Sequence, residues 1–242
     1  MIIDVNVSLG SWPFKELAID SPEKPASHFK KLDISQAWVR SCRAAFLTDP
    51  ANDNEKLCNQ LASYQNLKAV PTINPILSQW EQSLSLDNTK IINLYPSYHR
   101  YKADSPEVCR LAALLAEKQG TLLITMRMED SRSMHPDCII PGIPTEEIIA
   151  LAAKYPELKI VCLNATIFEM EKLLTQSPNI YCDMAYTEMG DTIKNLIEKV
   201  NYTQIVFGSH TPFYTTGAQL MKIKHSEVSG KVKKAILYSN IS

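Results

Sequence analysis

The chain has 242 residues, of which 45% are hydrophobic, enough for one large core or for two smaller domains. Its net charge is −1, from 25 basic and 26 acidic side chains. It therefore lacks the excess of basic residues with which proteins bind nucleic acid or an anionic membrane, and a small neutral or anionic molecule is the expected ligand.

The cysteine pattern and the N-terminal sequence indicate the cellular compartment of the protein. The six cysteines form no CxxC pair and have no metal-ligand spacing, which favours a reducing compartment. The chain begins directly with an apolar strand, and no apolar run approaches the roughly 18 residues of a membrane helix. We therefore expect a cytoplasmic protein without a membrane partner.

The first predicted strand, MIIDVNVS at residues 1–8, alternates apolar and polar residues. An alternation with a period of two places Asp4, Asn6 and Ser8 on one face of a strand and the apolar residues between them on the other. The polar face is expected to hold a ligand or to bond neighbouring strands, whereas Asp4, the deepest of the three, is expected to be structural.

Seven more apolar runs follow, and helical patterns separate them. The clearest helix covers residues 105–120, where Ser105 caps, Pro106 fits the first turn and Gly120 ends the pattern. A second helix, at residues 145–156, is predicted to start with Thr145 as its cap. The seven runs are QAWVRSC (36–42), LKAVPTI (67–73), KIINLY (90–95), TLLITMRM (121–128), LKIVCLN (158–164), NIYCDMA (179–185) and TQIVFGS (203–209).

This alternation predicts an α/β protein with the TIM (β/α)8 barrel fold, formed by residues 1–242 as a single domain. The main alternative is a doubly wound open sheet. That fold usually carries a glycine-rich phosphate loop after its first strand, and this chain, with seven glycines, has none there.

In a barrel of this kind the active site lies at the C-terminal ends of the strands. Polar residues concentrate at the predicted strand ends, and they are Asn6 and Ser8, Arg43, Asn74, Tyr95 with His99, Arg127 through His135, Asn164, Asp183 with Glu188, and His210.

At those positions the sequence resembles the amidohydrolase-related, metal-dependent hydrolases of TIM-barrel fold, in the branch that includes aminocarboxymuconate-semialdehyde decarboxylase and the lactonases. The family's first strand reads I-I-D-x-H-x-H-x-G, and this chain has IIDVNVSLG at residues 2–10. The last strand of the family reads F-G-S-D-x-P, matched by FGSHTP at 207–212. KIVCLNAT (159–166) and LLITMRMED (122–130) resemble its sixth and fifth strands, and ILYSN (236–240) its closing segment.

The resemblance implies a divalent metal such as zinc, but the ligand positions are substituted. In the family, four histidines and one aspartate hold the ion. Here the same positions carry Asn6, Ser8, Arg127, Asn164 and His210. An amide, a hydroxyl and a guanidinium cannot replace the three His, Asp, Glu or Cys ligands of a zinc enzyme. We therefore predict no metal ligands and no cofactor.

Two predicted loops add candidate ligand-binding residues. RMEDSRSMHP (127–136) contains Glu129, Arg132 and His135, and it forms either a self-paired surface loop or a carboxylate or phosphate site in which an acid or His135 moves protons. LYPSYHRY (94–101), with Tyr95 and His99, forms either an aromatic pocket wall or a packed lid.

Three functions stay open at this point. The first is a hydrolase or lyase that acts on a small carboxylate, lactone or amide without the usual metal, with His210 as acid or base and Arg127 stabilising negative charge. The second is a non-catalytic descendant of the family that binds a ligand or protein partner. The third is a metal enzyme whose ligands moved to His99, His135 and His210. A homo-oligomer is compatible with all three.

Overall fold

The computed structural model describes residues 1–19, 21–83 and 89–242. In these residues eight parallel strands follow one another along the chain. They are β1 (Ile3–Leu9), β2 (Gln36–Ser41), β3 (Leu67–Ala69), β4 (Ile91–Leu94), β5 (Thr121–Thr125), β6 (Lys159–Leu163), β7 (Ile180–Asp183) and β8 (Ile205–Val206). Each predicted apolar run coincides with one of them, although β1 extends one residue beyond its predicted run.

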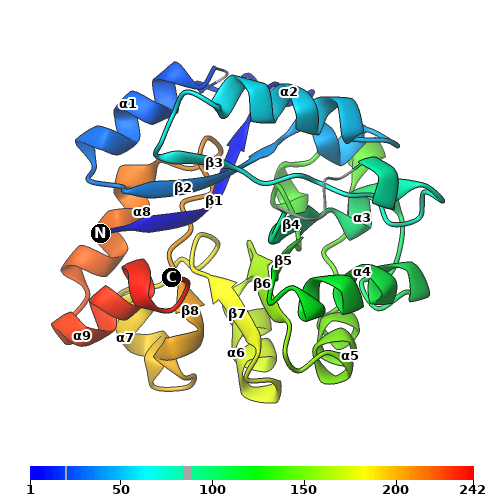
Figure 1. Ribbon diagram of the computed structural model, residues 1–242. Helices are drawn as coiled ribbons and strands as arrows, with labels where there is room; N and C mark the ends of the chain where they lie inside the picture. Colours follow the sequence, from blue (N-terminus) through cyan, green and yellow to red (C-terminus); the bar gives the residue numbers. More distant parts are fainter. Residues whose placement is uncertain (20, 84–88) are drawn as a thin grey trace.

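Helices surround the strands (Figure 1). They are α1 (Glu23–Lys31), α2 (Ala51–Leu61), the short α3 (Pro96–His99), α4 (Pro106–Glu117), α5 (Thr145–Lys154), α6 (Ile167–Gln176), α7 (Thr192–Ile197), α8 (Thr216–His225) and α9 (Gly230–Lys234).

Ladder hydrogen bonds join the strands in two sheets, β1-β2-β3 and β4-β5-β6-β7-β8. Two backbone hydrogen bonds cross each of the two seams between the sheets. The Ile73 amide donates to the Asn93 carbonyl of β4, and the Asn93 amide donates to the Pro71 carbonyl. At the other seam the Val5 amide donates to the Phe207 carbonyl and the Ser8 amide to the Thr211 carbonyl, both after β8. The predicted fold class, a TIM barrel, is thereby confirmed.

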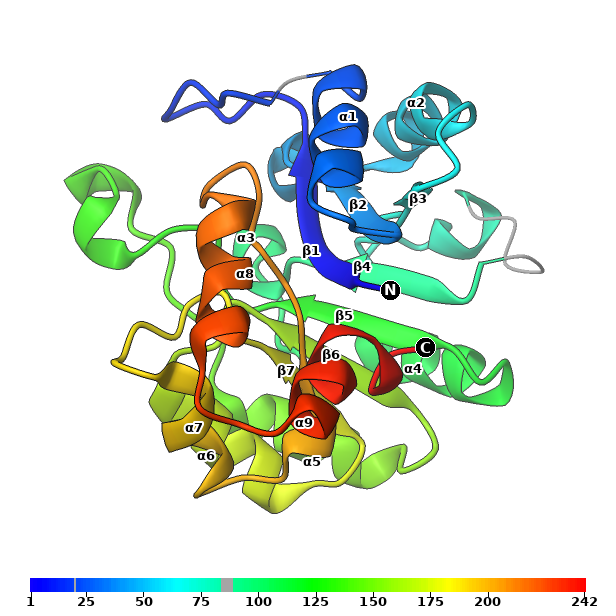
Figure 2. The same ribbon diagram turned by 90° about the vertical axis from the view of Figure 1, so that its left-hand side faces the viewer.

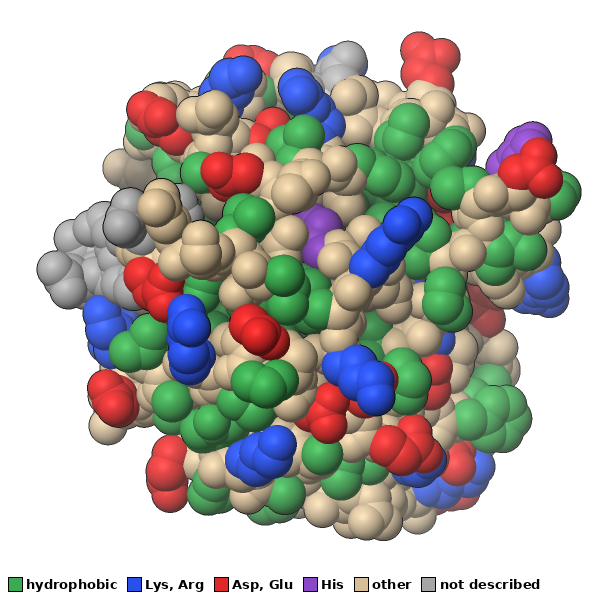
Figure 3. All heavy atoms as spheres, turned by 90° about the vertical axis from the view of Figure 1, so that its right-hand side faces the viewer, with side chains coloured by type: hydrophobic (Ala, Val, Ile, Leu, Met, Phe, Trp, Pro, Cys, Tyr) green, Lys and Arg blue, Asp and Glu red, His purple; other side chains and the backbone are tan. Residues whose placement is uncertain are grey.

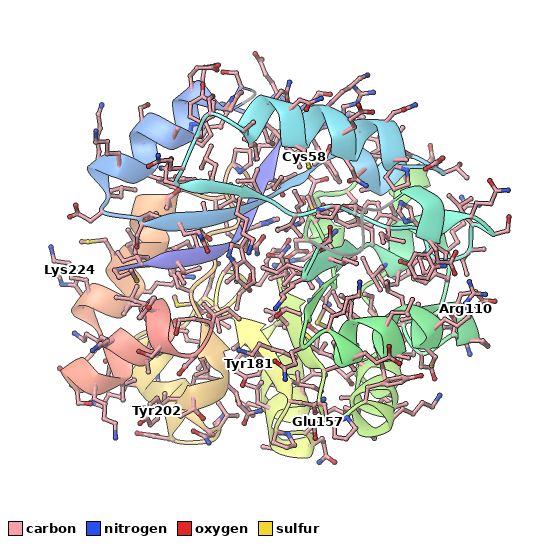
Figure 4. The ribbon with its side chains drawn as sticks, in the orientation of Figure 1. Cys58, Arg110, Glu157, Tyr181, Tyr202 and Lys224 are labelled. Atoms are coloured by element: carbon pink, nitrogen blue, oxygen red, sulfur yellow. The ribbon has the colours of Figure 1, made fainter. Side chains whose placement is uncertain are left out.

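Two apolar layers follow from this arrangement. The interior cluster draws its buried members from the strands and the C-terminal end, including Val5, Trp38, Leu123 and Val161. Tyr181 of β7 packs against it, and Figure 4 shows this side chain near the centre of the molecule. The larger outer cluster fills the space between strands and helices.

A β-bulge in β1 corrects the predicted alternation. Asp4 pairs with Ala37 but Val7 pairs with Val39, so β1 has one residue more than β2 between these pairs. Ile3 and Val5 belong to the interior cluster, whereas Val7 belongs to the outer one. The prediction that the three apolar residues share one face was therefore wrong, because an inserted residue reverses the alternation beyond it.

The helix starts agree with the predictions in one case of two. The Ser105 hydroxyl accepts a hydrogen bond from the Val108 amide at 3.4 Å and caps α4 as expected. Thr145 does not cap α5, because Pro144 holds the capping position and Thr145 is the first helical residue. Its hydroxyl donates to the Glu146 carboxylate instead.

The described parts of the chain contain no helix long and apolar enough to cross a membrane. On the face shown in Figure 3, acidic and basic side chains are interspersed. Arg110 illustrates the usual environment of these charges, since it lies on the outer side of α4 and pairs with Glu81 (Figure 4).

Candidate functional site

The segments that follow β1, β5, β7 and β8 extend from one end of the barrel (Figure 2). Beneath them lies a set of polar side chains with no solvent-exposed surface, which we call the mouth cluster. Burying so many polar groups is unfavourable unless they are hydrogen-bonded or have a function. The mouth cluster consists of Asn6, Ser8, Arg40, Asn164, Asp183 and His210.

Asn6 joins four strands through its side-chain amide. Its Nδ2 donates to Asn164 Oδ1 at 2.7 Å and also to Asp183 Oδ2, while its Oδ1 accepts from Arg40 Nη2 at 2.5 Å. The backbone amide of Asn164 donates to the other carboxylate oxygen of Asp183. Asn6, at a position where the motif that this chain resembles has a histidine, thus fixes β1, β2, β6 and β7 relative to one another.

Arg40 is an unusual member of the cluster because it is a buried cation without a carboxylate partner. It forms no ion pair with any residue that the structure describes, and its Nε has no hydrogen-bond partner. Guanidinium groups in protein interiors are almost always paired. Burial raises the pKa of Asp183 and the charge of Arg40 opposes that rise, so this nearby carboxyl compensates the charge in part, and Nε is the donor left for an anion that enters the cluster.

His210 follows β8 in a left-handed backbone conformation, with φ of 55°. Its Nε2 lies 2.8 Å from the Met128 carbonyl, which can only accept, so Nε2 carries the proton. Nδ1 then has a free lone pair, and no protein group in the described residues bonds to it. Burial and the nearby Arg40 charge lower the pKa of His210 to about 3, so the imidazole is neutral at physiological pH.

Ser8 lies between these two residues. It pairs in register with Arg40, and its backbone amide donates to the Thr211 carbonyl next to His210. Its hydroxyl faces the Cys42 thiol without a well-formed hydrogen bond. Three polar atoms that could bond a ligand, Ser8 Oγ, Arg40 Nε and His210 Nδ1, thus belong to neighbouring parts of the mouth cluster.

An aromatic cover closes the mouth, and its central residue is Trp12 of the segment after β1. The Trp12 ring lies 5.2 Å from Phe213 and 4.9 Å from Phe46, and Trp12 Nε1 donates to Glu129 at 2.8 Å. Phe213 in turn stacks on His210 at 4.7 Å. The cleft beside Trp12 has a volume of about 10 Å³, too small for any substrate, and no side chain of the mouth cluster lines it.

Arg127, which is predicted to stabilise negative charge, is already hydrogen-bonded to an acidic side chain. Both Nη atoms donate to Glu169, at 2.5 and 2.6 Å, and Nη1 also donates to the Asn164 carbonyl at 2.8 Å. Burial opposes ionisation of Glu169, but the hydrogen bonds and charge of Arg127 lower its pKa overall. Arg127 therefore positions Asn164, and the cation within the cluster is Arg40.

The structure separates the other predicted site residues. Tyr95 is buried and donates to the Ser41 carbonyl at 3.2 Å, and His99 donates to the Ala44 carbonyl at 2.9 Å. Arg132 pairs with Asp130 at the surface, and the His135 side chain is 64% exposed. The predicted charged loop is thus largely self-paired, and Tyr95 and His99 pack under the cover.

Arg40 and Trp12 are the functional candidates that the sequence analysis missed, and Asp183 was noted only as one of many strand-end residues. Arg40 is the one charged residue in the predicted strand QAWVRSC, and a charge at such a place is rarely buried without a function. The segment after β1 contains WPF at residues 12–14, whose two aromatic residues so close to a strand end could have indicated the cover.

The mouth cluster does not fit the divalent ion of the related enzymes. Asn6 directs two N–H bonds towards its neighbours, and its oxygen is occupied by Arg40, so no free donor atom remains. A guanidinium would also repel a cation at this position. Within residues 1–19, 21–83 and 89–242, no three His, Cys, Asp or Glu side chains come together, so His99, His135 and His210 do not form a relocated metal site.

The buried carboxyl groups predict an unusual pH dependence of stability. Burial raises the pKa of Asp4 to about 7 and that of Asp183 to about 6, from 3.8, so the folded state keeps protons that the unfolded chain loses. His210 acts in the opposite direction, because its pKa falls from 6.5 to about 3. Burial also lowers the pKa of His99, which therefore acts in the same direction as His210. The free energy of unfolding should therefore rise by about 2 kcal/mol at most between pH 7.5 and 5, measured by urea unfolding.

Asp4→Asn provides the control, because it keeps the Oδ1 acceptor for the Asn6 and Ser209 amides and removes the titration. Its unfolding free energy should be nearly flat over the same pH range and should exceed the wild-type value at pH 7.5. The exposed Asp33→Asn should keep the wild-type slope. A wild-type slope in Asp4→Asn would show that Asp4 is ionised in the folded protein.

Comparison with known proteins supports the fold. No family model matches the sequence, and no curated protein matches it. A dihydroxybenzoic acid decarboxylase from Polaromonas sp. JS666, solved with manganese and 2-nitroresorcinol, has a TM-score of 0.74 at 11% identity over 99% of this chain and 95% of its own. A 5-carboxyvanillate decarboxylase from Sphingomonas paucimobilis has a TM-score of 0.74 at 12% identity, over 99% and 97%. An amidohydrolase II structure has a TM-score of 0.73 at 15% identity, over 100% and 98%.

These likenesses define the class of structure. The chain has the fold of the amidohydrolase-related TIM barrels, as its strand-end motifs predicted. At 15% identity or less the comparisons show the fold alone, so the chemistry has to be argued from the mouth cluster itself.

Proposed function

We propose that residues 1–242 form a single-domain, amidohydrolase-related hydrolase or lyase that acts on a small carboxylate, or on a related lactone or amide, without a divalent ion. The observation that carries the proposal is the buried, unpaired Arg40 beside the neutral His210 at the C-terminal end of the barrel. The six cysteines are free, which supports a reducing, cytoplasmic setting.

His210 and Arg40 have different roles in the proposed reaction. His210 Nδ1 is the proton acceptor, and the Met128 carbonyl fixes the tautomer by accepting the Nε2 proton. Arg40 holds the anionic group and stabilises negative charge that develops on the reacting carbonyl or carboxylate. Asn6 orients Arg40, and Arg127 orients Asn164.

Anion binding would also activate the base. The charge of Arg40 is one reason why the pKa of His210 is low, and a bound carboxylate would neutralise that charge. The pKa of His210 should then move towards the range in which imidazole is an effective general base. A site built this way is inactive until the substrate is in place.

The test is turnover of a panel of small carboxylates, lactones and amides by the wild-type protein, His210→Gln and Arg40→Leu. The proposal expects at least one substrate whose turnover both substitutions abolish. Turnover that survives in both variants would locate the chemistry elsewhere.

One observation favours a second candidate, a non-catalytic descendant that binds a ligand. Every side chain of the mouth cluster is buried, and Trp12 and Phe213 close the site. Under this alternative, carboxylates bind in an Arg40-dependent manner, but no member of the panel is turned over.

The proposal also predicts that metal ions do not affect the protein. The purified protein should contain no stoichiometric zinc or manganese by elemental analysis, because the mouth cluster has neither the number nor the charge of ligands that such an ion needs. EDTA should leave its melting temperature unchanged, and added zinc should not raise it. A rise in melting temperature on adding zinc that His210→Ala abolishes would contradict the prediction.

A further inference from the structure

A second feature of the mouth is an open groove beside the mouth cluster. It has a volume of about 740 Å³ and lies over the ends of β5, β6 and β7. Its floor is the Arg127 guanidinium, and its apolar rim includes Ile139, Phe168 and Met189, whose exposed fractions are 57%, 79% and 48%. The cleft beside Trp12 is far smaller, and a third cleft at the ends of β1 and β2 has a volume of about 190 Å³, so the groove is the largest of these three openings.

A single pair of rings separates the groove from His210. Tyr186 and Tyr214 both line the groove, and their rings lie 5.5 Å apart. The same two rings lie 5.8 and 5.3 Å from the imidazole of His210, which does not itself line the groove. Both tyrosines are half-buried and belong to the segments after β7 and β8.

The route under Trp12 is more strongly closed. Trp12 contacts Phe14, Phe46, Tyr98 and Phe213, and it is also hydrogen-bonded to Glu129. An opening on that side has to separate four aromatic contacts and a hydrogen bond to a carboxylate. An opening on the groove side has to separate the two tyrosines from each other and from His210, and Tyr186 from Arg127, whose guanidinium lies 5.9 Å from its ring, but it breaks no hydrogen bond to a carboxylate. The groove side is therefore the lower-energy way to His210.

The charged side chains that line the groove indicate which part of a ligand would bind there. Arg127 is paired with Glu169, and Arg132 is paired with Asp130, so neither guanidinium is a free anion receptor. The exposed Glu188 adds a negative charge to the rim, which would repel a carboxylate there. The exposed apolar side chains of the rim, Ile139, Phe168 and Met189, can instead contact an apolar group. A ligand whose carboxylate lies at Arg40 would accordingly place an apolar remainder in this groove.

We infer that the groove is the entrance and the outer binding subsite of the mouth cluster, that Tyr186 and Tyr214 form its gate, and that the ligand is a carboxylate with an apolar tail. The inference rests on the proposed function for the position of the carboxylate. The position of the gate can be tested without any substrate.

Diethyl pyrocarbonate tests the gate, because it acylates an unprotonated imidazole nitrogen and His210 Nδ1 is unprotonated and without a partner. Peptide mapping gives the modification rate of His210 relative to the exposed His135 in the same sample. Tyr214→Ala should raise this ratio about tenfold, and Tyr214→Phe, which keeps the ring, should raise it less. Trp12→Ala, which removes a larger ring on the other route, should change it less than about twofold. The inference would be overturned if Trp12→Ala raised the His210 modification rate more than Tyr214→Ala did. It would also be overturned if no folded variant raised that rate.

The tail subsite is tested with two probes, acetate and 4-phenylbutyrate, by calorimetry. The wild-type protein should bind 4-phenylbutyrate about tenfold or more tightly than acetate. Met189→Asp should remove that difference and leave acetate binding unchanged, whereas the matched control Met221→Asp, with a methionine of similar exposure on α8, should preserve it. Equal affinities in the wild-type protein would overturn the tail subsite. If neither probe bound, the proposed function would be contradicted. The modification rates of His210 would still test the position of the gate, because they need no substrate.

Discussion

Arg40→Leu is expected to weaken acetate binding by about 100-fold or more, because truncating a buried charge that bonds an anion costs several kcal/mol. Arg40 is the one cation in the mouth cluster, and no described carboxylate pairs with it. Leucine keeps most of the apolar stem and removes the charge. Isothermal calorimetry on the folded variant measures the loss.

Arg43→Leu is the matched control for this substitution. Arg43 lies three residues further along the chain, its side chain is 53% exposed, and its nearest acidic partner is Asp53 at 3.9 Å. Removing it takes one positive charge from the same strand end without touching the mouth cluster, so acetate affinity should stay within about twofold of wild type. Equal losses in both variants would mean that acetate binds by general electrostatics.

NMR titration gives an independent readout of the same variant. The positive charge of Arg40 is one of the causes that lower the pKa of His210, so this pKa should rise in Arg40→Leu and stay unchanged in Arg43→Leu. A purely structural role of Arg40 would alter stability without this selective shift.

The barrel was predictable because its signals are local. Each strand is a short apolar run, and helices such as α4 carry their own caps and stripes. The strand-end rule then placed Asn6, Asn164 and His210 at one end without any knowledge of contacts. The structure brings Asn6 and Asn164 into direct contact and buries His210 in the same cluster.

The partners of these residues were not predictable, because they depend on contacts between distant parts of the chain. Arg127 bonds to Glu169, 42 residues away, and a loop sequence rich in mixed charges does not reveal that contact. The β-bulge in β1 depends on the pairing with β2, so the alternation read from β1 alone reversed after Val5. Arg40 was overlooked because hydrophobic patterning treats one polar residue within a strand as facing solvent.

Gly208→Ala is expected to destabilise the protein by about 3 kcal/mol or more, since overpacking and the loss of buried hydrogen bonds add together. A Cβ at this position would lie 2.6 Å from Asp183 Oδ2, 2.7 Å from Asp183 Cβ and 2.8 Å from Asn6 Cβ. Neither Cβ can move without its strand, and Asn6 and Asp183 bond to each other. The added methyl group should therefore force apart the hydrogen bonds that join β1 to β7, and urea unfolding should show a lower midpoint.

Gly217→Ala separates this effect from the general effect of replacing glycine. Gly217 is the second residue of α8, and a Cβ there meets nothing within 4 Å. Alanine at that position should stabilise the protein by about 0.5–1 kcal/mol, because glycine loses more backbone entropy on folding and has a lower helix propensity. The two substitutions should thus change the free energy of unfolding in opposite directions.

If Gly208→Ala cost less than about 1 kcal/mol, the contact between Asn6 and Asp183 would be loose enough to admit a methyl group. The mouth cluster would then lack the rigidity needed to hold Arg40 and His210 in place for catalysis.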